Sequence, residues 1–116
     1  MPYEIELISL RCNDAQESRD EPYLRVNNRT AWGPTRMHTG DTLAIGRCVA
    51  FNRDVRVELR EVDWSPDDHF GTMHLSVRLV RAITRGAHPP LMHPFHRDLG
   101  ILGDASYTLT YDLHRT

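Results

Sequence analysis

Hydrophobic and polar residues alternate along most of this chain of 116 residues. The alternation is clearest near the end, where Ala105, Tyr107, Leu109, Tyr111 and Leu113 share one face and polar residues share the other. A period of two is typical of half-buried antiparallel strands, and helical periodicity is scarce. The pattern, clear in places and weaker in others, predicts strands over residues 3–7, 22–27, 30–32, 42–51, 55–59, 73–79 and 105–113.

Turn-forming residues separate these segments, among them Asn27-Asn28, Gly33-Pro34 and Gly40-Asp41. About seven to eight short strands at this spacing predict an all-β fold, an antiparallel β-sandwich, with a small closed barrel as the alternative. The proline-rich stretch 88–96 is expected to be a long loop between the strand near 73–81 and the last strand. We expect residues 1–116 to form a single sandwich domain.

The composition of the chain limits the kinds of molecule that it is expected to bind. The net charge of −2 argues against a nucleic-acid binder, which normally carries a basic excess. All 14 basic residues are arginine, so any anion site would use the planar guanidinium group. The sequence has no signal-peptide pattern and no apolar run near the roughly 20 residues of a membrane span. We expect a cytoplasmic location, with signal-independent export as the alternative.

The two cysteines, Cys12 and Cys48, each lie near the end of an apolar run. Without an export signal, this context favours buried free thiols over a disulfide.

Acidic residues concentrate in two stretches between predicted strands. NDAQESRDEPY (13–23) and EVDWSPDDHFG (61–71) together hold eight of the 16 acidic residues. Crowded carboxylates repel one another unless they are protonated or a cation neutralises them. Calcium binds six to eight oxygen atoms, many of them from carboxylates. Two such loops at one end of a sandwich would form a calcium cage, whereas the simpler alternative is a pair of solvated acidic turns.

The two stretches also carry recognisable motifs. The first ends in Asp20-Glu21-Pro22-Tyr23 and enters a strand, and the second reads Glu61-x-Asp63, then Asp67-Asp68, then His69-Phe70-Gly71. In this order, and about 40 residues apart, they resemble the loops of the C2 domain, a calcium- and lipid-binding β-sandwich. The resemblance covers about residues 3–80. The chain is also similar to short bacterial sandwich modules that carry DEPYLxVN, WG, GDT and YTLTY.

The C2 resemblance implies a set of calcium ligands and a membrane contact. The implied ligands are Glu21, Glu61, Asp63, Asp68 or Asp67, and Asp14 or Glu17 from the first loop. Positions 21 and 61 carry Glu where the family has Asp, and Asp14 lies one residue early. At the tip of the second loop, Trp64 would enter the lipid interface, where its apolar ring and polar N–H both find partners. The alternative is that Trp64 folds back onto its own sheet.

The histidine-rich stretch offers a weaker metal site. His88, His93 and His96, with Asp98 as a fourth ligand, have the residue types that bind zinc. The intervening prolines extend the backbone and spread the rings, so this stretch is better explained as a surface or interface loop. No nucleophile motif frames any serine or cysteine, and we expect a non-catalytic protein, with a zinc enzyme as a remote alternative.

Together these patterns predict a calcium-binding C2-like module that docks on acidic lipid headgroups or an acidic protein partner. The alternative from another class is a metal-independent structural or adaptor subunit of a larger assembly. In that case edge strands or the stretch 88–104 would form the contact surface, and the protein would oligomerise.

Overall fold

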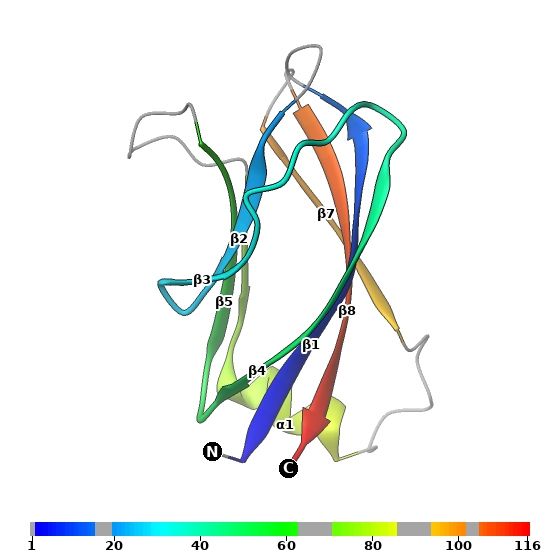
Figure 1. The fold of residues 1–116 in the computed structure, drawn as a ribbon. Coiled ribbons are helices and arrows are strands. Elements are labelled where there is room, and N and C mark those ends of the chain that lie inside the picture. Colours follow the sequence, from blue (N-terminus) through cyan, green and yellow to red (C-terminus); the bar gives the residue numbers. More distant parts are fainter. Residues whose placement is uncertain (1, 16–19, 63–70, 86–93, 102–104) are drawn as a thin grey trace.

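The computed structural model describes residues 2–15, 20–62, 71–85, 94–101 and 105–116, with only the backbone described at position 101. Figure 1 shows the arrangement of the elements. In chain order the elements are β1 (Tyr3–Asp14), β2 (Pro22–Val26), β3 (Arg29–Trp32), β4 (Thr42–Phe51), β5 (Val55–Glu61), β6 (Gly71–Leu75), α1 (Val77–Thr84), β7 (Phe95–Ile101) and β8 (Ala105–Arg115).

The strands form two four-stranded sheets. One has the order β4-β1-β8-β7 and the other β3-β2-β5-β6, and neighbouring strands are antiparallel. The two sheets face each other (Figure 1). The predicted antiparallel β-sandwich is therefore confirmed, and the alternative of a small closed barrel is wrong because the sheet edges do not join.

Alternation places the core between the sheets. On β8 the alternate residues from Ala105 to Leu113 are buried and those between them are half-buried, as the sequence pattern predicts. Ile5 and Leu7 on the neighbouring strand β1 extend this inner face and have no exposed surface. Each such buried side chain contributes roughly 1.5–3 kcal/mol of transfer free energy, so the inner faces supply most of the stability.

The expected strand over 73–79 is wrong in its second half. β6 ends at Leu75, and Ser76 caps the helix α1 by accepting the Leu79 N–H at 3.3 Å. The apolar residues Val77, Val80 and Ile83 recur every three positions, which is a helical spacing. The MHLSVRL alternation thus spans two different elements, and the serine between them marks the boundary.

The expected long loop over 88–96 is also wrong at its end. β7 begins at Phe95 and pairs with β8 from Phe95 opposite Tyr111 to Ile101 opposite Ala105. Proline cannot donate a backbone hydrogen bond, but the last proline is Pro94, directly before the strand. β7 is moreover an edge strand, where pairing is needed on one side only.

The segment after β3 braces the start of β2. Gly33 has a φ of +79°, and a Cβ atom there would lie 2.7 Å from the Pro22 carbonyl oxygen. The Thr35 N–H donates to that same oxygen at 3.1 Å, and Met37 exchanges backbone hydrogen bonds with Asp20. This close backbone packing fixes the point where β2 emerges from the first acidic stretch.

Candidate metal and membrane site at the loop end

The two acidic stretches meet the sandwich at neighbouring strand ends. β2 begins where β5 ends, and Pro22 lies directly opposite Glu61 in their register. β1 ends at Asp14 in the other sheet. This end of the sandwich lies opposite the helix α1 and the two chain termini (Figure 1). Glu21 and Glu61, which are 40 positions apart in sequence, are therefore close neighbours.

Glu61 is held in place by backbone hydrogen bonding. Its side chain atom Oε1 accepts the Glu21 N–H at 3.0 Å, and the residue is only 7% exposed. The next N–H, that of Val62, donates to the Glu21 carbonyl at 3.3 Å. A buried carboxylate needs such donors to offset its lost hydration. Glu61 thus ties the two strand ends together, a role that the sequence did not predict.

The Glu21 carboxylate is more accessible. Its side chain is 40% exposed, and Oε1 lies 4.0 Å from Nε of Arg36. An exposed ion pair at this distance contributes little free energy, typically below about 1 kcal/mol. Arg36 therefore holds the Glu21 carboxylate only weakly.

Asp20 faces the core and was missed as a structural residue. It is 3% exposed, and the Tyr107 hydroxyl donates to Oδ2 at 2.6 Å. Burial first, and then the hydrogen bond to Asp20, raise the pKa of Tyr107 well above its usual range. The alternation of residues could have revealed this role, because Asp20 continues the buried face formed by Pro22, Leu24 and Val26. The many acidic residues in the stretch instead suggested that Asp20 faces solvent or a cation.

The two thiols differ in exposure. Cys12 is buried, and burial raises the pKa of its thiol. Cys48 is exposed on an edge strand, so the expectation of two buried thiols is wrong for this residue. Both are free, as expected.

Only part of the predicted ligand set can be compared with the structure. Asp14 is exposed at the end of β1, opposite Ser106 of β8, in the sheet that does not contain Glu21 and Glu61. Among the residues that the structure describes, no group of three or more His, Cys, Asp and Glu side chains is placed to hold a metal ion. Glu17, Asp63, Asp67, Asp68 and Trp64 lie outside the described residues.

The alternative zinc site is described at one of its three histidines. His96 lies on β7, with Nδ1 2.9 Å from the Thr110 hydroxyl, and the nearby Asp98 accepts the Thr108 hydroxyl at 2.9 Å. Both side chains therefore have partners on β8. His88 and His93 lie outside the described residues, so the zinc interpretation stays a prediction.

Comparison with known proteins identifies the fold. Over 99% of its length the chain matches a structure of two C2 domains, A and B, of extended synaptotagmin 2, with a TM-score of 0.57 and 14% identity, and it spans 42% of that longer chain. It also matches a structure of a C2 domain, with a TM-score of 0.51, 12% identity and 97% of each chain covered. The chain has a C2-like fold. The sequence matches no protein-family model and no curated protein.

The C2-like fold explains the arrangement of the acidic stretches. Both stretches leave the sandwich at one end because β1 and β5 end there and β2 begins there. The described part of the chain contains no helix long and apolar enough to cross a membrane.

Proposed function

We propose that this C2-like module is a non-catalytic calcium-binding unit that docks on a membrane surface with acidic lipid headgroups or on an acidic protein partner. The observation that carries the proposal is the adjacency of Glu21 and Glu61 at the paired ends of β2 and β5. It supports a site shared by the two acidic stretches, 14–21 and 61–68. Further carboxylates would come from Asp14 or Glu17 and from Asp63 with Asp67 or Asp68.

The mechanism is electrostatic. Calcium would neutralise carboxylates that otherwise repel one another, and Glu21 would exchange its weak contact with Arg36 for the ion. The bound ion would then reverse the local field, so that anionic headgroups approach. Trp64 would add an interfacial contact beside the ion.

Thermal unfolding in the presence of calcium tests this function. Because a ligand that binds only the folded state stabilises it, calcium at 100 times its Kd would add about 2.7 kcal/mol and raise the Tm. The double variant Asp63→Asn with Asp68→Asn should lose this shift. The matched control, Glu4→Gln with Glu6→Gln, removes the same charge from β1, far from the loop end, and should keep it. If millimolar calcium does not raise the Tm of the wild type, the proposal is contradicted.

The hydrogen bonding of the buried Glu61 carboxylate favours a second function. This carboxylate is buried and already accepts a backbone hydrogen bond, which fits a structural role for the loop end. The module would then be a metal-independent structural or adaptor subunit. Its size in solution discriminates the two functions, because oligomers that persist in chelator support the adaptor and a monomer in both conditions contradicts it.

A further inference from the structure

The two long sides of the sandwich differ. On one side β6 and β7 approach so closely that a Cβ atom on Gly71 would lie 3.1 Å from the Gly100 nitrogen. On the other side, the edge strands β3 and β4 border two hollows of about 670 and 570 Å³. Ala31 and Arg47 line both hollows, which therefore form one groove along the open side. We call this groove the β3–β4 groove.

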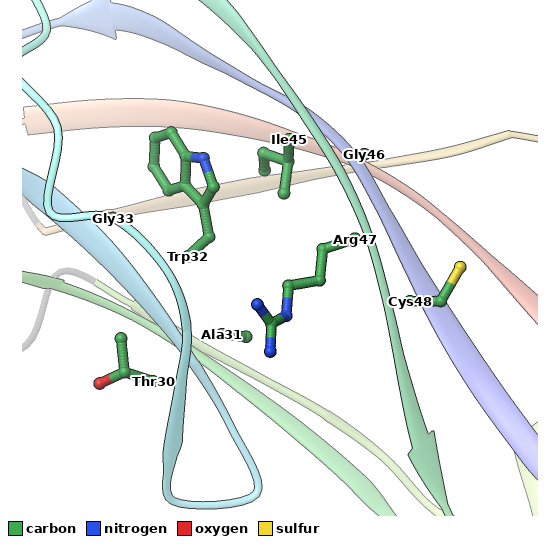
Figure 2. Close-up of a pocket in the computed structure, with 8 residues that line it drawn as sticks. All are labelled: Thr30, Ala31, Trp32, Gly33, Ile45, Gly46, Arg47 and Cys48. Carbon is green, nitrogen blue, oxygen red and sulfur yellow. The ribbon is translucent and has the colours of Figure 1, made fainter.

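An arginine occupies an inward position of this groove. The inward-facing residues of β4 alternate along the strand as Leu43, Ile45, Arg47, Val49 and Phe51. Arg47 lies directly opposite the fully buried Leu7 in the register with β1, so the two side chains leave the same face. Figure 2 shows the guanidinium group reaching from β4 toward Ala31, while Cys48 points the other way.

This arginine has no electrostatic partner in the described ranges. Arg29 and Arg53, which line the smaller hollow with Arg47, likewise make no ion pair or side-chain hydrogen bond there. The carboxylate of Asp54 also borders this hollow, but it accepts the Val77 N–H at 3.0 Å and lies 3.1 Å from Nε2 of His74. The groove therefore presents three exposed guanidinium groups that pair with no carboxylate among the described residues, beside the apolar side chains of Ile45 and Val49.

The geometry points to an extended acidic peptide of a partner protein as the ligand of the β3–β4 groove, added as a strand along β4. β4 is a ten-residue edge strand, and an edge offers unpaired backbone groups to an incoming strand. A strand in this position directs alternate side chains inward. One carboxylate would form a bidentate pair with Arg47, and small apolar residues on either side would contact Ile45 and Val49.

Charge and shape both favour a peptide over a membrane surface here. Arg47 is exposed, and its side chain projects from β4 over the groove toward Ala31, so a ligand that reaches into the groove meets both the guanidinium group and the apolar residues beside it. An extended chain can do so while it hydrogen-bonds β4, whereas a flat bilayer contacts the protruding parts of a surface. The site does not involve the acidic loop end, and so it is independent of the calcium proposal.

Fluorescence anisotropy in the presence of chelator tests the inference. The probe is the labelled peptide Glu-Thr-Val-Thr-Glu-Thr-Val-Thr, whose Glu and Val side chains share one face, and the neutral probe has Gln in place of Glu. We expect Arg47→Gln to weaken binding of the acidic probe by about tenfold or more, the usual effect of losing a charge-assisted hydrogen bond. The neutral probe should bind the wild type more weakly than the acidic probe by a similar factor. Arg85→Gln on the distant end of α1 changes the net charge equally and should alter binding by less than about twofold.

Hydrogen exchange separates the remaining outcomes. Protection of β4 amides by the acidic probe supports strand addition. The inference is overturned by absence of binding, by equal loss in Arg47→Gln and Arg85→Gln, or by protection on another face. Binding of phosphatidylserine vesicles, but not of the peptide, through Arg47 would also overturn it, because it would assign the groove to lipid.

Discussion

The hydroxyl of Tyr107 on β8 donates a 2.6 Å hydrogen bond to Oδ2 of Asp20, the residue that exchanges backbone hydrogen bonds with Met37 before β2 begins. The bond ties the first acidic stretch, just before β2, to a strand of the other sheet. We predict that Tyr107→Phe lowers the free energy of unfolding by about 1–3 kcal/mol, because Asp20 loses a donor in a buried site. Urea denaturation measures the change.

Tyr111→Phe is the matched control for this substitution. Tyr111 lies on the same strand and is nearly as buried, but it stacks on Phe95, and its hydroxyl has no hydrogen bond in the described part of the chain. A loss in Tyr111→Phe equal to that in Tyr107→Phe would show that the Asp20 bond contributes nothing.

Two substitutions of Glu61 should distinguish its role as a hydrogen-bond acceptor from the effect of its charge. Glu61→Gln keeps an oxygen that can accept the Glu21 N–H, so its stability should stay within about 0.5 kcal/mol of the wild type. Glu61→Ala removes that acceptor and should cost about 1–3 kcal/mol. Chemical denaturation in calcium-free buffer measures both, and equal losses would contradict the hydrogen-bonding role.

Gly33 should tolerate substitution less well than Gly40. Both have positive φ, but a Cβ atom on Gly33 meets the Pro22 carbonyl oxygen at 2.7 Å, and a Cβ atom on Gly40 meets nothing within 4 Å. Gly40→Ala should cost about 1–2 kcal/mol from its backbone conformation alone. Gly33→Ala should cost more, because β2 must also shift. Thermal unfolding gives the order, and a reversed order would refute the bracing of β2.

His114 should make stability weakly dependent on pH. Its Nε2 lies 2.9 Å from Oε1 of Glu6, and this hydrogen bond raises the pKa of His114 above its ordinary value of 6.5. The resulting stabilisation is full below the unfolded pKa and is lost as the pH rises through the raised folded pKa. The Tm of the wild type should therefore fall slightly between about pH 6 and pH 8 relative to Glu6→Gln. An NMR titration that gives His114 a pKa at or below 6.5 would contradict this.

The strands were predictable because alternation records which face is buried. On β8 and on most of β1 every second residue enters the core, and few structures besides a half-buried strand produce a period of two. The helix α1 was missed because it is only eight residues long and follows β6 after a single capping serine. β7 was missed because the prolines before Phe95 predicted a loop, although an edge strand that pairs on one side only can begin directly after a proline.

The candidate site was predictable only in outline. The C2 resemblance implied that Glu21 and Glu61 belong to one site, and they are neighbours. Composition could not distinguish an acidic residue that faces solvent from one that supports the fold, so the buried roles of Asp20 and Glu61 were missed. The inward position of Arg47 depends on the pairing of β4 with β1, which the sequence does not specify.

In the membrane form of the proposed function, calcium brings the acidic loop end onto an anionic lipid surface. Cosedimentation with vesicles of phosphatidylcholine and phosphatidylserine, in calcium or in chelator, tests it most directly. We predict that the protein pellets with these vesicles in calcium and stays in the supernatant in chelator. Asp63→Asn with Asp68→Asn should abolish pelleting, and Glu4→Gln with Glu6→Gln should preserve it. Equal pelleting of the wild type in calcium and in chelator, or none in either, would contradict calcium-dependent membrane docking.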